Sequence, residues 1–172
     1  MCYTRALIFT ARREWYNEEK VIAGIATKGE DMSAEQNITN AKRAIQAIND
    51  RDWSFIPKLL APNFIRHDLA EAFDEVMGHE SFTDFLQLVL KALPDYRIQI
   101  EDIFAVEDRL AMRFTASGTH QGELLGYAPT GKRVKINQIN LYRFDEDKLT
   151  ETWQLMDVAG FLRQIGALPT FQ

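Results

Sequence analysis

The sequence predicts an α+β domain in which helices come first and an antiparallel sheet follows. Apolar residues recur at helical spacing in the segments 34–50 and 81–93. From Tyr96 onward the period changes to two, as in strands that bury one face. Helices and strands segregated in this way are typical of the α+β class. A curved antiparallel sheet wrapped around three N-terminal helices would form a cone-shaped barrel open at one end, which suits a small ligand.

Three helices are expected before the sheet, over residues 34–50, 53–60 and 81–93. Ser33 and Gln36 have the spacing of a capping box at the start of the first helix. Pro62 closes the short second helix, because proline cannot continue one. Ser81 can cap the third helix, which ends before Pro94.

Five strands are expected, over residues 63–67, 96–105, 110–120, 133–144 and 149–156. The apolar positions change parity near Asp102, which indicates a β-bulge there. A loop rich in glycine spans residues 121–132, and residues 145–148 form a turn. Asp157 can cap a final short helix that runs through Ile165.

Composition limits the partners of the chain. With 172 residues, 46% of them hydrophobic, it fits one globular domain. A formal charge of −5 gives no attraction for nucleic acid or anionic membranes, so we expect neither as a partner. The apolar runs are too short to span a bilayer. Cys2 is the only cysteine, which excludes an internal disulfide and is compatible with the cytoplasm, where we expect the protein.

The regular pattern begins only after residue 31. We therefore expect residues 1–31 to be a loosely attached extension, and residues 32–172 to form the single domain. The extension lacks a basic n-region and a convincing cleavage site, so it does not read as a signal peptide.

Two amides lie where a strand should be apolar. In the segment KINQINLYRF, residues 135–144, the side chains of Gln138 and Asn140 share a face with Ile136. Burying an amide without a partner costs roughly 1–3 kcal/mol. Either protein partners meet these amides inside, or a ligand does.

Several short motifs in residues 118–169 together resemble one family. They are His120-x-Gly122, Pro129-Thr130-Gly131-Lys132, Tyr142-Arg143-Phe144 and Leu162-Arg163-Gln164-Ile165-Gly166. This set resembles the SnoaL-like polyketide cyclases, often called ester cyclases, of the NTF2-like group. The resemblance covers residues 33–169 and implies an NTF2-like barrel.

The resemblance also implies a reaction. The characterised cyclases close a polyketide ring by an intramolecular aldol reaction without metal or cofactor, and an aspartate on the last strand acts as acid and base. In this chain Gln154 falls at the position of that aspartate. Gln138 matches a pocket glutamine, Asn140 replaces a histidine, and Arg66 or His67 takes the place of a pocket asparagine.

An amide cannot act as a base, so a replacement is needed if the chain is an enzyme. His120, on the apolar face of its strand, is one candidate, although it can instead hold the loop that follows. His67 at the cavity mouth is another. Asp157 is the carboxylate nearest to the missing aspartate and can also be a helix cap. Arg66 could neutralise an acidic substrate or pair at the surface.

Three functions remain open, and the third is a scaffold that dimerises through the outer face of the sheet. The first is a cofactor-independent enzyme of the cyclase or isomerase type, in which Gln138, Asn140 and Gln154 orient a small, apolar, carbonyl-containing ligand. The second is a binding protein that holds such a ligand without turning it over. No metal or nucleotide motif is present in the sequence. We also expect a homo-oligomer, a dimer or tetramer, formed through the outer sheet face that carries Ile139 and Leu141.

Overall fold

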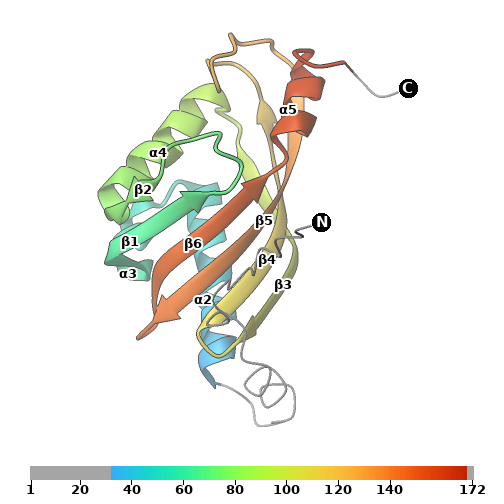
Figure 1. Ribbon diagram of the computed structural model, residues 1–172. Coiled ribbons are helices and arrows are strands. Elements are labelled where there is room, and N and C mark those ends of the chain that lie inside the picture. Colours follow the sequence, from blue (N-terminus) through green and yellow to red (C-terminus); the bar gives the residue numbers. More distant parts are fainter. Residues whose placement is uncertain (1–31, 170–172) are drawn as a thin grey trace, which may run out of the picture. The chain divides into compact units, whose positions relative to one another are not determined.

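The computed structural model describes residues 32–169, and in this range helices lie against the concave face of a curved sheet (Figure 1). The helices are α2 (Met32–Asp50), the 3-10 turn η1 (Trp53–Phe55), α3 (Ile56–Leu59), α4 (Gly78–Ala92) and α5 (Val158–Ile165). The strands are β1 (Leu60–Asp68), β2 (Val76–Met77), β3 (Arg97–Val106), β4 (Arg109–Thr119), β5 (Arg133–Asp145) and β6 (Lys148–Met156). The predicted α+β class is confirmed. The predicted extension over residues 1–31 lies outside the described residues and stays a prediction.

The six strands form one sheet in the order β2-β1-β6-β5-β4-β3. All neighbouring pairs are antiparallel except β1 and β6, which run parallel. The expectation of a wholly antiparallel sheet is therefore wrong at this one pair. The chain leaves β1 through β2 and α4 and re-enters the sheet at its far edge, so β1 and β6 meet without a hairpin between them.

Two helix boundaries differ from the sequence prediction. Helix α4 begins at Gly78 rather than after Ser81, and its N-cap Met77 makes no side-chain capping bond. The hydroxyl of Thr83 donates to the carbonyl of His79 at 2.9 Å, so the turn before Ser81 is already helical. Gly78 allows this early start because its φ of 79° is one that glycine adopts without strain.

The predicted helix over residues 53–60 is divided into η1 and α3, and β1 already starts at Leu60. Pro62 therefore lies in β1 rather than after the helix that it was expected to close. The register of β1 against β6 shifts between Leu60 and Ile65, which places a bulge beside this proline. The bulge predicted near Asp102 is confirmed by a register shift between Ile100 and Asp102.

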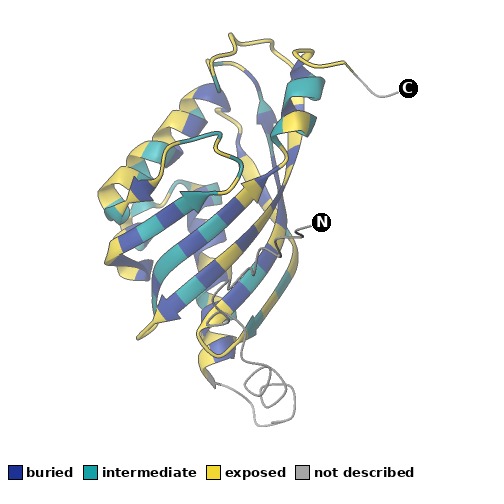
Figure 2. Cartoon of the chain, in the orientation of Figure 1, coloured by how far each residue is buried: buried dark blue, intermediate teal, exposed yellow. Residues whose placement is uncertain are grey.

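Strand β5 alternates regularly between buried and exposed residues along its length (Figure 2). The buried set is Val134, Ile136, Gln138, Asn140, Tyr142 and Phe144. They face the core that α2 and α4 complete with Ala41, Ile45, Leu86 and Val89. The two amides thus lie inside, on the face that the period of two predicted.

The outer face of the sheet carries several exposed apolar side chains in the range 32–169, beside charged ones such as Lys135 and Arg113. Phe104, Ile139, Leu141 and Leu155 each expose about half of their surface or more. Leu141 lies beside Ala111 on β4 and Trp153 on β6, so the apolar positions run across neighbouring strands. The expected homo-oligomer would use this face, and it stays a prediction. No helix in the described range is long and apolar enough to cross a membrane.

The loop after β4 is tied to the end of α4. The backbone N–H groups of Gln121 and Gly122 both donate to the carbonyl of Ala92, at 2.9 and 3.0 Å. A Cβ atom on Gly122 would lie 2.4 Å from the carbonyl oxygen of Lys91. The close approach of two backbone segments therefore requires glycine at this position.

We predict that Gly122→Ala lowers the free energy of unfolding by about 1–3 kcal/mol, because backbone atoms must move to admit the methyl group. The neighbouring exposed side chain provides the matched control, since Gln121→Ala should change stability by less than about 0.5 kcal/mol. Urea denaturation of both variants would measure the difference. Equal stability of the two variants would show that the loop does not pack on α4 as described.

Candidate active site

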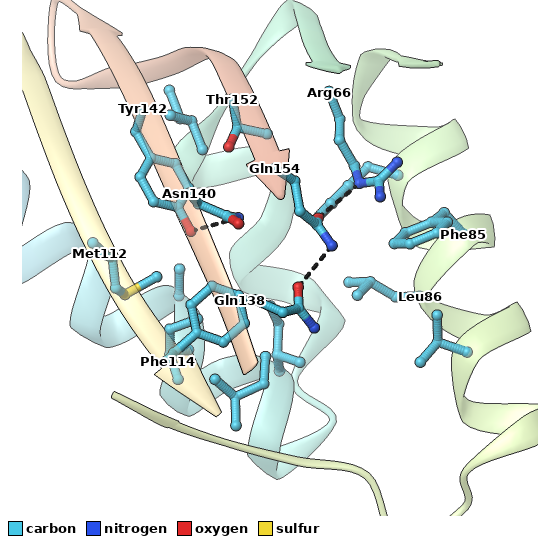
Figure 3. Close-up of a pocket in the computed structure, with 18 of the residues that line it drawn as sticks. Arg66, Phe85, Leu86, Met112, Phe114, Gln138, Asn140, Tyr142, Thr152 and Gln154 are labelled. Atoms are coloured by element: carbon cyan, nitrogen blue, oxygen red, sulfur yellow. Dashed lines mark hydrogen bonds between the residues drawn. The ribbon is translucent and has the colours of Figure 1, made fainter. Parts of the chain in front are cut away.

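A cavity of about 110 Å³ lies between the concave face of the sheet and the helices α2 and α4. Its wall is largely apolar, with Ala41 and Ile45 from α2 and Phe85 and Leu86 from α4. The polar side chains that line it gather on one side, as Figure 3 shows. They are Arg66, Gln138, Asn140, Tyr142, Thr152 and Gln154, and Tyr96, which precedes β3, also lines the cavity.

Strand register brings these side chains together. Asn140 on β5 lies directly opposite Gln154 on β6, and Gln138 is the diagonal neighbour of Gln154. Arg66 on β1 pairs with Thr152 on β6, two residues from Gln154 and on the same face. The polar patch therefore spans three adjacent strands.

A directional chain of hydrogen bonds links three of these residues (Figure 3). Arg66 Nε donates to Gln154 Oε1 at 3.0 Å, and Gln154 Nε2 donates to Gln138 Oε1 at 2.7 Å. Gln138 in turn hydrogen-bonds the phenol of Tyr96, an interaction that favours the phenolate. The partners of Gln138 and Gln154 are therefore inside the protein.

Arg66 determines which way both amides point. A guanidinium only donates, so Gln154 must turn its oxygen toward Arg66 and its NH₂ group away. Gln138 must then present its oxygen to Gln154, which leaves its own NH₂ group as a donor. Both glutamines are thus orientated by a charge, and the NH₂ group of Gln138, which carries two N–H donors, is the group that meets the phenol of Tyr96.

Asn140 is not fixed in the same way. Its Nδ2 donates to the hydroxyl of Tyr142 at 3.0 Å, while its Oδ1 is buried without a partner among the described residues. A phenol both donates and accepts, so the amide of Asn140 can present either its oxygen or its NH₂ group to a ligand. This position can adapt to what the ligand offers.

Arg66 is fully buried and incompletely paired. Burial lowers the pKa of its guanidinium, and the nearby Asp68 carboxylate opposes that shift. The distance from Arg66 Nη2 to Asp68 Oδ2 is 3.4 Å, longer than the 2.7–2.9 Å typical of a charge-assisted hydrogen bond. Nη1 is buried and has no partner among the described residues. The ring of Phe85 lies 4.2 Å from the guanidinium carbon.

Two buried phenols stay neutral. Burial raises the pKa of Tyr96 to about 12, although its hydrogen bond with Gln138 opposes the shift. Burial also raises the pKa of Tyr142, and its hydrogen bond with Asn140 opposes the shift. Both hydroxyls are therefore available as hydrogen-bond donors at neutral pH.

Four of the residues chosen from the sequence meet in the cavity wall: Arg66, Gln138, Asn140 and Gln154. His67, His120 and Asp157 do not line it. The sequence reasoning missed Tyr96 and Tyr142. Tyr142 shares the parity of Gln138 and Asn140, and this signal could have identified it.

His67 faces the opposite side of the sheet from Arg66. Its Nδ1 lies 2.7 Å from Glu75 Oε2, and its ring stacks on Trp153 with centroids 5.3 Å apart. His67 thus does not line the cavity, but it lines an open pocket on the surface, and its expected role at the cavity mouth stays a prediction. Of the two residues that could replace the pocket asparagine, Arg66 is the one that points inside.

His120 and Asp157 hold local structure. His120 is fully buried, its Nδ1 lies 3.1 Å from Thr130 Oγ1, and its ring packs edge-on against Phe161. It thus holds the loop over residues 121–132, the second of the two roles weighed for it. The carboxylate of the exposed Asp157 accepts from the backbone N–H of Gly160 at 2.7 Å and caps α5.

The cavity wall lacks an evident base. Among the described residues that line it, the ionisable side chains are Arg66, Tyr96 and Tyr142, and none is a carboxylate or an imidazole. Asp68 lies closest, but its two oxygens accept from the backbone N–H groups of Ala70 and Phe73 at 3.0 and 3.1 Å. No group of His, Cys, Asp and Glu in the described range could hold a metal ion. The site is built to stabilise negative charge rather than to remove a proton.

Phe73 separates the cavity from a second pocket. This residue of the loop between β1 and β2 lines the cavity and also an open pocket of about 720 Å³ on the surface. Its ring packs edge-on against Phe85, with centroids 5.2 Å apart. Among the described residues, this ring is the side chain that lines both spaces.

Comparison with known proteins matches this arrangement to one family. Residues 39–165 match the family of SnoaL-like polyketide cyclases. The aklanonic acid methyl ester cyclase AcmA of Streptomyces galilaeus is 26% identical over 134 residues, which cover 76% of this chain and 91% of that protein.

Solved structures of proteins similar to this chain have the same overall fold. AclR, a proposed hydroxylase from Streptomyces galilaeus, is 31% identical with a TM-score of 0.71, covering 81% of this chain and 91% of its own. IdmH, a proposed polyketide cyclase from Streptomyces antibioticus, is 26% identical with a TM-score of 0.68. The match covers 76% of this chain and 99% of IdmH. Two different reactions are thus named for proteins that resemble this chain.

We predict that stability falls as pH rises between about 10 and 12, because the buried tyrosines must ionise in the folded state at a higher pH than in the unfolded one. Each phenol has a raised folded pKa, so its contribution is fully present below pH 10 and is lost above it. Chemical denaturation at several pH values would measure this slope, and Tyr96→Phe should reduce it. An unchanged slope in Tyr96→Phe would contradict the burial of that phenol.

Proposed function

The chain belongs to the SnoaL-like polyketide cyclase family, and on this basis we propose that it acts on a small, polyketide-like carbonyl or ester compound through an enolate, without a cofactor. Family membership supports a role of the cyclase or isomerase type. The finer assignment rests on the chemistry of the cavity.

One observation carries the proposal, namely the directional chain from Arg66 through Gln154 to Gln138. Because each amide is orientated by its neighbour, donors are held in place before any substrate arrives. Fixed donors in a dry site stabilise an oxyanion more strongly than water does, because they need not reorganise. A carbonyl oxygen that gains charge as it becomes an enolate is the ligand that fits this wall.

The proposed reaction is an internal rearrangement of one molecule. A proton leaves the carbon beside the carbonyl to water, which becomes a hydronium ion, and the enolate oxygen accepts a hydrogen bond from the NH₂ group of Gln138. The enolate carbon then attacks a second carbonyl carbon of the same molecule, which forms the ring bond. The resulting alkoxide takes back the proton that the first step gave to water, either directly or through the neutral phenol of Tyr96, which donates its proton to the alkoxide and regains one from that hydronium ion.

Size places a condition on the substrate. A volume of about 110 Å³ is below the 300–1,000 Å³ of typical ligand pockets. A ring-forming substrate therefore needs Phe73 to move and open the cavity toward the larger surface pocket. The apolar wall of the cavity favours a mostly apolar substrate, whereas the surface pocket beyond Phe73 is lined largely by acidic side chains.

A second candidate is a binding protein that holds the same carbonyl compound. The observation that favours it is the lack of a carboxylate or imidazole among the described residues of the cavity wall. The two candidates differ in whether the bound compound exchanges its acidic proton.

We predict that the protein accelerates hydrogen–deuterium exchange at the carbon between the two carbonyls of methyl acetoacetate and of larger β-keto methyl esters. Gln138→Leu should reduce this acceleration on the order of a hundredfold, because it removes one donor from the developing oxyanion. The exposed Gln99 on β3 provides the matched control, and Gln99→Leu should leave the rate unchanged. Proton NMR in deuterated water follows the exchange directly.

The same experiment separates the two candidates. Compounds that bind, as judged by ligand-observed NMR, but exchange no faster than in buffer would establish a binding protein. Equal acceleration by Gln138→Leu and the unchanged chain would refute the role of the amide chain.

A further inference from the structure

The buried cation of the cavity has donors that the protein does not use. Arg66 carries five N–H donors, yet it makes one good bond, to Gln154, and one long contact, to Asp68. Nη1 is buried and meets no acceptor among the described residues. A charged group taken out of water costs several kcal/mol unless its charge and its hydrogen bonds are met.

Asp68 compensates this charge only in part. One of its oxygens accepts from the N–H of Ala70, and the other from the N–H of Phe73. These bonds hold the carboxylate on the loop after β1 and keep it 3.4 Å from the guanidinium. A second anion could therefore still bind Arg66 favourably.

The surroundings of Arg66 also define the direction of approach. The ring of Phe85 covers a face of the guanidinium at 4.2 Å. Gln154 accepts from Nε, and Nη1, buried in the plane of the guanidinium, has no acceptor among the described residues. A planar carboxylate matches an arginine in its plane, where two parallel hydrogen bonds can form.

From these observations we infer that Arg66 forms a carboxylate-binding site in the cavity, and that the substrate carries a free acid group on an apolar body. The identity of the substrate rests on the proposed function, whereas the carboxylate site itself does not. A methyl ester would offer a carbonyl oxygen but no charge, and the guanidinium would stay poorly compensated. AcmA, by contrast, is named for a methyl ester.

Matched acid and ester pairs test this inference. The probes are phenylacetic acid and naphthylacetic acid, each beside its own methyl ester, with dissociation constants measured by NMR titration at neutral pH. The acid of at least one pair should bind more tightly than its ester, on the order of tenfold to a hundredfold, as expected for hydrogen bonds to a charged group. Tighter or equal binding of the esters, or no binding of either acid, would overturn the inference.

Variants assign the preference to Arg66. Arg66→Met should abolish the preference for the acid, while Arg113→Met, which removes an exposed charge from β4, should retain it. If Arg66→Met fails to fold because Asp68 is left buried and unpaired, the double variant Arg66→Met with Asp68→Asn removes both charges. A folded variant without Arg66 that still prefers the acid would refute the site.

Asp68→Asn distinguishes a ligand site from a purely structural ion pair. The amide keeps an oxygen for one of the two loop N–H groups that Asp68 accepts from and no longer compensates the guanidinium, so the acid should bind more tightly than to the unchanged chain. A structural pair would leave acid binding unchanged or weaken it. The probes need no enolisation, so an acid preference without proton exchange would reject the proposed reaction and retain the carboxylate site.

Discussion

A guanidinium group that is buried away from water needs acceptors for its N–H groups, and Arg66 is such a group in the wall of the cavity. Its burial explains why the polar residues of β5 and β6 are amides rather than apolar side chains. The oxygen of Gln154 accepts a hydrogen bond from Arg66, and its NH₂ group donates one to Gln138. A single group that can only donate thus fixes the orientation of two amides that could otherwise turn either way. Their oxygens point toward Arg66 and their NH₂ groups point away from it.

The register between the strands holds these polar side chains together on the inner face of the sheet. Gln154 lies opposite Asn140, and a slip of one residue between β5 and β6 would send every second side chain to the outer face. Regular alternation along β5 keeps the amides inside and Ile139 and Leu141 outside. The same pairing that buries the core therefore holds the donors in place, so folding and preorganisation of the site are one event.

The sequence predicted the parts of the site that depend on alternation alone. Gln138 and Asn140 lie on the predicted face because β5 continues without a bulge over this stretch. Arg66 and His67 could not be told apart, because the register of β1 shifts between Leu60 and Ile65 and alternation cannot be counted across such a shift. The pairing of Arg66 with Gln154 was also beyond sequence reasoning, because it depends on a parallel contact between strands 88 residues apart.

The buried Arg66 gives a reason for an amide, and not a carboxylate, at position 154. An aspartate at position 154 would lie beside the guanidinium, which would favour its ionised form and lower its pKa. A carboxylate held in this way is a weak base, so the arginine would reduce the value of the family's aspartate for removing a proton. With an amide at position 154, the arginine keeps its remaining donors for a ligand. With Gln154 where the family resemblance implies an aspartate, the site would favour binding and stabilising an anion over proton abstraction, and the unpartnered Nη1 of Arg66 is where we propose that this anion binds.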